Sequence, residues 1–304
     1  MQILYLLEGL RTPFFDGLLS ALTYLGDEVV FIVLALFIYW CVDKRWGCYV
    51  LAVSFLSTLL NQFLKIVCQV PRPWVRDPAF TIVESARSGA TGYSFPSGHA
   101  ANITGTLGSW ARFTKKTWLR VLCIVGILAV CFSRMYLGVH YPTDVLFSLV
   151  VGIVLVLAFY PIFRNAQDDA GRIRITFAAI VVLALCSALF TELRDWGSDI
   201  DVENLNEATK NAWLLTGGGA GMLFGIWVED KYIHFPTQAP WWAQLLKLVL
   251  GLALVMAIRL GLKAILPPSR WCNALRYLCM VLFAACVWPL TFPWFARGCK
   301  KAAA

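Results

Sequence analysis

The sequence predicts an all-α fold, a polytopic integral membrane helical bundle, and three observations support this class. Of the 304 residues, 59% are hydrophobic and 14% are charged, whereas soluble domains are about 45–50% apolar and about 25% charged. The apolar residues gather in runs close to the roughly 20 residues that a membrane-spanning helix requires. The 13 Trp and 10 Tyr residues suit the aromatic belts found at membrane surfaces. These features exclude a soluble enzyme and a disordered chain.

Nine apolar segments are expected to span the membrane. They lie at about 27–42, 48–65, 99–114, 118–135, 144–162, 174–193, 210–228, 243–266 and 273–296. The first and third are short enough to be tilted or partly re-entrant, so we expect eight or nine transmembrane helices. We divide the chain into an interfacial N-terminal segment (1–26), a membrane core (27–193) and additional C-terminal transmembrane helices of unassigned role (194–304).

Loop charges predict the orientation in the membrane. The net charge is +8, but its basic residues lie mostly in short loops, which favours a topology signal over nucleic-acid binding. Basic residues mark alternate loops on one side, which the positive-inside rule makes cytoplasmic. These residues are Lys44, Arg45, Arg112, Lys115, Lys116, Arg120, Arg164, Arg172, Arg174, Arg297, Lys300 and Lys301. Three others, Lys263, Arg270 and Arg276, would face outward against the rule.

The first residues lack the basic n-region and cleavage site of a signal peptide. Together with the charge bias, this favours a bacterial plasma membrane. Two loops are unusual. The stretch 66–98 is long for a compact domain, which favours a functional role, and it faces outward with the turn 136–143. The acidic stretch 194–207 is expected to be a solvated loop outside the membrane.

Three polar segments lie at the outer ends of predicted spans. KIVCQVPRP contains Lys65 and Arg72, FPSGHAAN contains His99, and SRMYLGVHYPTD contains Arg134, His140 and Asp144. Each feature has an ordinary structural explanation when taken singly. Basic residues at span ends can snorkel to the interface, a serine such as Ser97 commonly caps a helix, and an acidic residue in a first helical turn complements the helix dipole.

The combination predicts an anion site. A cluster of Lys65, Arg72 and Arg134 is repulsive unless an anion neutralises it, and the amides of Ser97, Gly98 and His99 at a helix start are suited to binding one. Arginine forks and free amides match a tetrahedral oxyanion such as phosphate. Two histidines beside it would supply a nucleophile and a proton donor. Because the cations are side chains, we expect no metal and no other cofactor.

The three segments resemble the signature of the type 2 phosphatidic-acid phosphatase superfamily, K-x6-R-P, P-S-G-H and S-R-x5-H-x3-D. Every fixed position of that signature is present, and the resemblance covers roughly residues 48–162. The matching residues are Lys65, Arg72, Pro73, Pro96, Ser97, Gly98, His99, Ser133, Arg134, His140 and Asp144. The resemblance implies a six-helix phosphatase-like core within 27–193. The helices after residue 193 extend beyond that pattern.

The resemblance also implies a mechanism. His140 would attack phosphorus and form a phosphohistidine, Asp144 would orient its ring, and His99 would act first as acid and then as base. The phosphate-binding residues would be Lys65, Arg72, Ser97, Gly98 and Arg134. The implied substrate is a membrane lipid phosphate or prenyl diphosphate handled on the extracytoplasmic side. Prenyl diphosphates of the wall-carrier type such as undecaprenyl diphosphate, phosphatidic acid and phosphatidylglycerol phosphate remain alternatives.

Two other functions stay open at this point. A lipid phosphotransferase would use the same residues with a hydroxyl acceptor in place of water. A transporter of a phosphorylated solute would use the basic cluster for binding. Transporters often contain two related halves with broken helices, and the sequence shows no such halves, so transport is the weaker alternative.

Overall fold

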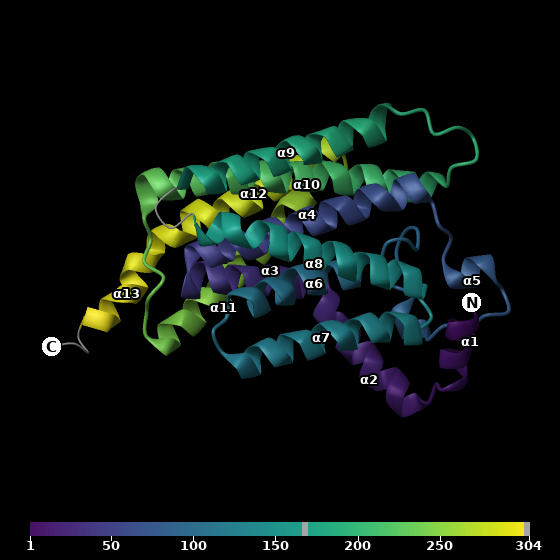
Figure 1. Cartoon of the computed structure of the whole chain (residues 1–304). Helices are drawn as coiled ribbons and strands as arrows, with labels where there is room; N and C mark the ends of the chain where they lie inside the picture. Colours follow the sequence, from purple (N-terminus) through teal and green to yellow (C-terminus); the bar gives the residue numbers. More distant parts are fainter. Residues whose placement is uncertain (166–169, 301–304) are drawn as a thin grey trace. The chain divides into compact units, whose positions relative to one another are not determined.

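The structure is a computed structural model that describes residues 1–165 and 170–300. These residues form helices and loops and contain no strand, which confirms the all-α class. The α-helices (Figure 1) are α1 (Gln2–Gly9), α2 (Pro13–Thr23), α3 (Glu28–Phe37), α4 (Lys44–Cys68), α5 (Pro73–Arg76), α6 (Gly98–Phe113), α7 (Thr117–Tyr136), α8 (Pro142–Arg164), α9 (Ala170–Leu193), α10 (Val202–Val228), α11 (Trp241–Ile265), α12 (Arg270–Leu282) and α13 (Phe292–Lys300).

Short 3₁₀ and π segments connect or extend these helices. They are η1 (Tyr24–Gly26), η2 (Ile38–Val42), η3 (Glu84–Ala86), η4 (Glu229–Ile233), η5 (Phe283–Val287) and η6 (Trp288–Thr291). Eight of the nine predicted spans coincide with a long helix or with the α12–α13 run, and the predicted span 27–42 is α3 with η2. Lys301, one of the basic residues in the orientation argument, lies outside the described residues.

The chain forms two compact units. Unit 1 consists of Met1–Ile32, Val53–Pro161 and Trp196–Ala208. Unit 2 consists of Val33–Ala52 and of the described parts of Ile162–Asp195 and Thr209–Ala304. All eight predicted site residues belong to unit 1, so the candidate site can be described within one unit.

The structure confirms a polytopic helical membrane protein. Within the described residues, six helical segments are long and apolar enough to cross a membrane: Lys44–Arg76, Thr117–Tyr136, Pro142–Arg164, Ala170–Leu193, Trp241–Ile265 and Arg270–Arg297. A seventh is possible if Pro13–Gly26 and Glu28–Val42, which meet at a bend of 51°, form one broken span. This number is below the eight or nine that the sequence predicts.

Two helices account for most of the difference. Helix α6 has 16 residues, about 24 Å at 1.5 Å per residue, whereas the hydrocarbon core is about 30 Å thick. Helix α10 is longer, but Glu203, Glu207 and Lys210 occupy its N-terminal third and a glycine run lies at its middle. Both helices exist where predicted, yet neither is a simple apolar span.

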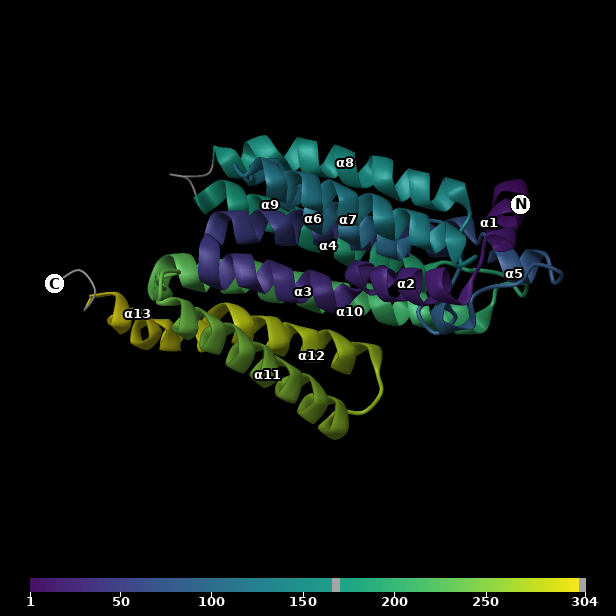
Figure 2. The same ribbon diagram turned by 90° about the horizontal axis from the view of Figure 1, so that it is seen from below.

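Helix α6 is packed deeply within unit 1. Small and hydroxylated side chains allow its neighbours to approach closely, as is common between membrane helices. Thr58 of α4 donates a hydrogen bond to Asn102 of α6 (3.0 Å between Oγ1 and Oδ1). A Cβ atom on Gly152 of α8 would lie 2.6 Å from Cγ2 of Thr104. Figure 2 shows α6, α7 and α8 running side by side, so the start of α6 lies close to the end of α7 and the start of α8.

The N-terminal helices and the loop 66–98 meet the end of α7. The hydroxyl of Tyr136 donates to Asp16 Oδ1 (2.9 Å), and Arg11 Nε donates to the Tyr136 carbonyl (3.1 Å). The amide of Val83 donates to the Leu137 carbonyl (3.1 Å). These contacts fix the turn that follows α7, where His140 lies. The interfacial position of residues 1–26 stays a prediction.

The acidic segment differs from the expectation of a solvated loop. The carboxylate of Asp201 accepts from the amides of Glu203 (3.0 Å) and Asn204 (3.1 Å), so it caps α10. Residues 202–207 are therefore helical, and two of them face a pocket described below. In unit 2, the buried amine of Lys247 donates to the carbonyls of Trp40 (2.8 Å) and Thr237 (3.1 Å), which gives this cation a structural role.

Candidate active site

The three sequence motifs converge at one end of unit 1. Lys65 lies in the last turn of α4, Arg72 precedes α5, and Ser97 precedes α6. Arg134 lies in the last turn of α7, and Asp144 lies in the first turn of α8. His140 is in the turn between α7 and α8. Helix boundaries therefore place the polar residues of all three motifs beside one another.

Proline and glycine determine the local geometry. Pro73 and Pro142 occupy first positions of α5 and α8, where the missing amide hydrogen costs nothing and φ is already helical. Gly138 has φ of +80°, and a Cβ atom there would lie 2.7 Å from Arg11 Nη2 and 2.9 Å from Phe80 Cε1. The turn that carries His140 therefore requires glycine at position 138.

His140 and Asp144 form a buried pair. The side chain of His140 is 2% exposed and that of Asp144 is 1% exposed, and His140 Nδ1 lies 3.3 Å from Asp144 Oδ2. The same carboxylate oxygen accepts from Ser94 Oγ (2.6 Å) and from the Tyr141 amide (3.0 Å). Asp144 is thus held by two other donors, and it directs the Nδ1 proton of His140 toward itself. This tautomer leaves Nε2 as the nucleophilic nitrogen.

Arg72 contacts that free nitrogen. Its Nη1 lies 3.0 Å from His140 Nε2 and donates to the Val139 carbonyl (2.8 Å). Its Nη2 and Nε donate to the carbonyls of Thr91 (2.6 Å) and Gly92 (3.0 Å). The guanidinium is therefore fixed by backbone oxygens directly beside the nitrogen that would attack phosphorus.

His140 is held in its neutral form. Burial lowers the pKa of His140 well below its ordinary value of 6.5, and the positive charges of Arg72, Arg134 and Lys65 lower it further. A neutral imidazole is the nucleophilic form, so these surroundings keep His140 unprotonated at neutral pH, with its Nε2 lone pair hydrogen-bonded only to Arg72 in the described residues.

Three cations, Lys65, Arg72 and Arg134, surround the pair. Lys65 Nζ donates to the carbonyls of Thr91 (3.1 Å) and Tyr93 (3.0 Å). Arg134 is 1% exposed and donates from Nη1 to Thr23 Oγ1 (2.9 Å), while its Nε and Nη2 have no hydrogen-bond partner. In the part of the chain that the structure describes, none of the three cations is in an ion pair within 4.0 Å. Buried donors without partners are costly, and these two donors of Arg134 are available to a bound anion of the kind that the sequence predicts.

The start of α6 faces the same cluster. Ser97 caps the helix by accepting from the Ala100 amide (3.5 Å), and its own amide donates to the Asp144 carbonyl (3.3 Å). The amides of Gly98 and His99 are in the first turn, where a helix offers no preceding carbonyl to accept from them. His99 lies beside the loop 66–98, because a Cβ atom on Gly89 would lie 3.9 Å from His99 Cε1.

The sequence prediction did not include several residues of this site. Ser94 and the carbonyls of residues 91–93 hold Asp144, Lys65 and Arg72. Asn61 is one helical turn before Lys65 and 3% exposed, and neither its Nδ2 nor its Oδ1 has a partner. Its Oδ1 is 3.6 Å from where a Cβ atom of Gly98 would lie. The i, i+4 spacing of Asn61 and Lys65 on α4 is the sequence signal that indicates this neighbour.

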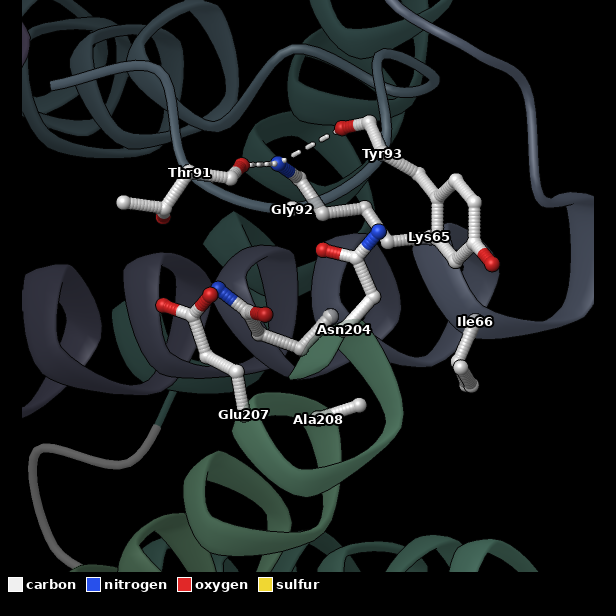
Figure 3. Close-up of a pocket in the computed structure, with 9 residues that line it drawn as sticks. Lys65, Ile66, Thr91, Gly92, Tyr93, Asn204, Glu207 and Ala208 are labelled. Carbon is white, nitrogen blue, oxygen red and sulfur yellow. Dashed lines mark hydrogen bonds between the residues drawn. The ribbon is translucent and has the colours of Figure 1, made fainter. Parts of the chain in front are cut away.

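A pocket adjoins Lys65. Figure 3 shows that α4, the loop 91–93 and the first turns of α10 surround it. Its lining residues are Gln62, Lys65, Ile66, Thr91, Gly92, Tyr93, Asn204, Glu207 and Ala208. Within residues 1–165 and 170–300, no three His, Cys, Asp or Glu side chains are grouped as metal ligands. The use of no metal or other cofactor stays a prediction.

Comparison with known proteins identifies the family. The model of the PAP2 superfamily matches residues 46–168, and that of the PAP2 superfamily phosphatase transmembrane extension matches residues 213–300. No solved structure matches the chain.

Three curated relatives represent the range of similarity. Lipid A 4'-phosphatase of Bacteroides thetaiotaomicron is 29% identical over 165 residues, which cover 50% of this chain and 71% of the relative. Phosphatidylglycerophosphatase B of Bacillus subtilis is 33% identical over 162 residues, covering 48% of this chain and 74% of the relative. Sphingosine-1-phosphate phosphatase 1 of Mus musculus is 26% identical over 259 residues, covering 81% of this chain and 59% of the relative.

These matches agree with the resemblance that the motifs indicated, and they confirm the predicted class of enzyme. The chain belongs to the PAP2 superfamily and is a membrane phosphatase of the kind that acts on lipid phosphates.

Proposed function

We propose that this protein hydrolyses a lipid phosphate or lipid diphosphate through a phosphohistidine formed on His140. The observation that carries the proposal is the buried His140–Asp144 pair, whose free nitrogen faces Arg72 (3.0 Å from Nη1 to Nε2). Beside it, Arg134 has two unpartnered nitrogen atoms in a buried position. A nucleophile, its orienting carboxylate and cations that form no ion pair in the described part of the chain thus lie together.

In the first step, the Nε2 lone pair of His140 attacks phosphorus, and the bond from phosphorus to the lipid oxygen breaks. His99 donates a proton to that oxygen, so the lipid leaves as an alcohol or as a monophosphate if the substrate is a diphosphate. Asp144 stabilises the positive charge that develops on the imidazole. A bound phosphate is negatively charged, so it offsets the surrounding cations and favours a protonated His99 before the step.

In the second step, His99 accepts a proton from water, the water oxygen attacks phosphorus, and the bond from His140 to phosphorus breaks. Inorganic phosphate then leaves, and His140 is neutral again. Lys65, Arg72 and Arg134 would hold the phosphate oxygens in both steps, together with the amides near Ser97 and Gly98. Asn61 joins this set, because its buried amide lies against Gly98.

We further propose that the site opens on the extracytoplasmic side of the membrane. In unit 1 the catalytic cluster lies at the start of α6, whereas Arg112, Lys115 and Lys116 lie at the other end of this helix. The positive-inside rule places that basic end in the cytoplasm. Cys68, which is exposed at the end of α4, should then react with a membrane-impermeant thiol reagent in intact cells, and a Cys68→Ser variant should lose this labelling. Lys115→Cys in the same background should be labelled only after permeabilisation. The reverse pattern would overturn the orientation.

The substrate is proposed at the level of its class. The relatives act, by their names, on lipid A, phosphatidylglycerol phosphate, undecaprenyl diphosphate and sphingosine 1-phosphate. All of these present a phosphate at the membrane surface while their chains stay in the bilayer. The expected bacterial plasma membrane and the division into a core (27–193) and a C-terminal extension (194–304) remain predictions.

Phosphate release tests the proposal. The purified protein in detergent and EDTA would be offered undecaprenyl diphosphate, phosphatidic acid, phosphatidylglycerol phosphate and sphingosine 1-phosphate. We expect release from at least one, loss of release in His140→Ala, and normal release in the control His234→Asn, which changes a histidine of unit 2. Labelled phosphate that appears on an added alcohol would indicate a phosphotransferase. Failure to turn over any substrate, with or without an alcohol, would refute the enzyme and favour the transport alternative.

A further inference from the structure

The pocket beside Lys65 contains hydrogen-bond acceptors that the phosphate does not require. Asn204 and Glu207 reach it from the first turns of α10 (Figure 3). Both lie in Trp196–Ala208, the segment of unit 1 that follows the predicted core. The segment that follows the predicted core therefore contributes side chains to the pocket beside Lys65.

Asn204 is oriented by the cap of α10. Its Nδ2 donates to Asp201 Oδ2 (3.1 Å), which leaves Oδ1 directed to the pocket, 3.9 Å from where a Cβ atom of Gly92 would lie. A Cβ atom at this same position would lie 4.0 Å from Lys65 Nζ. The side-chain oxygen of Asn204 and the phosphate-binding amine of Lys65 thus face the same small space beside Gly92.

Glu207 places a negative charge next to a site for an anion. Its carboxylate acts electrostatically on both Lys65 and Arg72. It forms no ion pair within 4.0 Å with either cation in the described part of the chain, and both cations are held by the carbonyls of residues 91–93. Glu207 therefore does not position the cations, and its charge alone would weaken the binding of a simple phosphate monoester.

We propose that Asn204 and Glu207 bind the ammonium and hydroxyl groups of an amino-alcohol phosphate, so that the pocket selects lipids with a protonated amine near the phosphate. The two acceptors match the donors of such a head group, and the carboxylate becomes favourable once a cation faces it. This inference rests on the proposed phosphatase function. The relative named sphingosine-1-phosphate phosphatase 1 matches over 81% of the chain. An alignment of this length includes the start of α10 at whichever residue the alignment begins.

The test compares two lipid phosphates that differ in these donors. Sphingosine 1-phosphate has an amine on the carbon next to the phosphate-bearing carbon and a hydroxyl on the carbon after that, and octadecyl phosphate has neither. The quantity is the ratio of kcat/KM for the first substrate to that for the second. Because a hydrogen bond to a charged group is lost, we expect Glu207→Gln to lower the ratio about tenfold or more. Asn204→Leu should lower it in the same direction.

Matched controls lie on the same helix. Glu203 and Asn206 are exposed and do not line the pocket, so Glu203→Gln and Asn206→Ala should leave the ratio unchanged. A ratio that Glu207→Gln does not change would overturn the inference. An equal loss for both substrates would also overturn it, because Glu207 would then act through Lys65.

The wild-type protein separates this inference from the proposed function. If its kcat/KM for octadecyl phosphate equals that for sphingosine 1-phosphate, the selectivity is refuted and the phosphatase stands. If it hydrolyses neither these nor the other lipid phosphates, the proposed function fails, and the inference fails with it.

Discussion

Replacement of Asp144 by asparagine should abolish most of the catalysis while leaving the fold intact. The Oδ2 atom of Asp144 accepts three hydrogen bonds, from Ser94 (2.6 Å), Tyr141 (3.0 Å) and His140 (3.3 Å). An amide keeps the shape of the carboxylate but loses its charge, and its NH2 group would face a donor. His140 would then be favoured in the tautomer that places its proton on the attacking nitrogen.

The magnitude follows from the distance between the two groups. Attack on phosphorus makes the His140 ring cationic, 3.3 Å from the carboxylate. Opposite charges about 4 Å apart interact by about 4 kcal/mol at an effective dielectric constant of 20. A loss of about 4 kcal/mol from the transition state lowers the rate about a thousandfold. The comparable substitution in serine proteases, which also yields the wrong tautomer, costs about ten thousandfold.

The assay is kcat for phosphate release in detergent, with the thermal unfolding midpoint measured on the same samples. Asp77→Asn is the control, because Asp77 lies in the loop 66–98 and accepts from Tyr5 rather than from a site residue. We expect the control to keep its activity. A decrease of less than tenfold in Asp144→Asn, with an unchanged unfolding midpoint, would refute the role of Asp144 in stabilising the ring.

Four other predictions follow from the site. Because burial and neighbouring cations lower the pKa of His140, NMR titration of the substrate-free protein should show protonation of His140 below pH 6.5. Arg134→Gln should move this protonation to higher pH. Titration of His140 at or above pH 6.5 in the wild type would contradict this account. Asn61→Leu should weaken inhibition by inorganic phosphate about tenfold without lowering the unfolding midpoint, and an unchanged inhibition constant would exclude Asn61 from the site. Ser94→Ala should lower kcat about tenfold by releasing Asp144, and full activity would show that the Tyr141 amide suffices. Gly138→Ala should lose about 1–3 kcal/mol of stability, and an unchanged unfolding midpoint would show that the turn adapts.

Sequence reasoning could predict the site because helix ends carry it. Pro73, Pro142 and Ser97 are start signals that can be recognised without a structure, and each precedes or follows a charged residue of the motifs. The helix ends that carry these residues belong to α4, α6, α7 and α8, and in the structure these ends lie together. The structure accordingly brings Arg72, His140 and Asp144 into contact as the motif spacing indicates.

The number of spans was harder to predict, because packing decides it. Helix α6 is buried by contacts of polar and small side chains such as Asn102 and Thr104. The hydropathy and the length of its sequence therefore do not show whether it crosses the whole membrane. In the same way, residues 13–26 carry a charge and a proline yet form one arm of a bent pair. Periodicity alone does not separate a re-entrant or broken helix from a simple span.

The contacts from distant segments were beyond prediction. Nothing in the acidic stretch 194–207 indicates that Glu207 faces the pocket of Lys65, because its position depends on how the first turns of α10 lie beside the end of α4 within unit 1. Lys65 and Arg72 both donate to backbone carbonyls of residues 91–93, and these carbonyls have no sequence signature. The hydrogen bond from the Ser97 amide to the Asp144 carbonyl is likewise a tertiary contact.

Chemical trapping of the enzyme intermediate tests the central claim most directly. p-Nitrophenyl phosphate needs little protonation of its leaving group, so His99→Ala should be phosphorylated by it but should hydrolyse the intermediate slowly. Quenched protein should then carry a phosphate that is labile in acid and stable in base, as expected of a phosphohistidine, on the peptide containing His140. The account predicts this label in His99→Ala and its absence in His140→Ala. Label that persists in His140→Ala, or turnover by that variant at the wild-type rate, would contradict it.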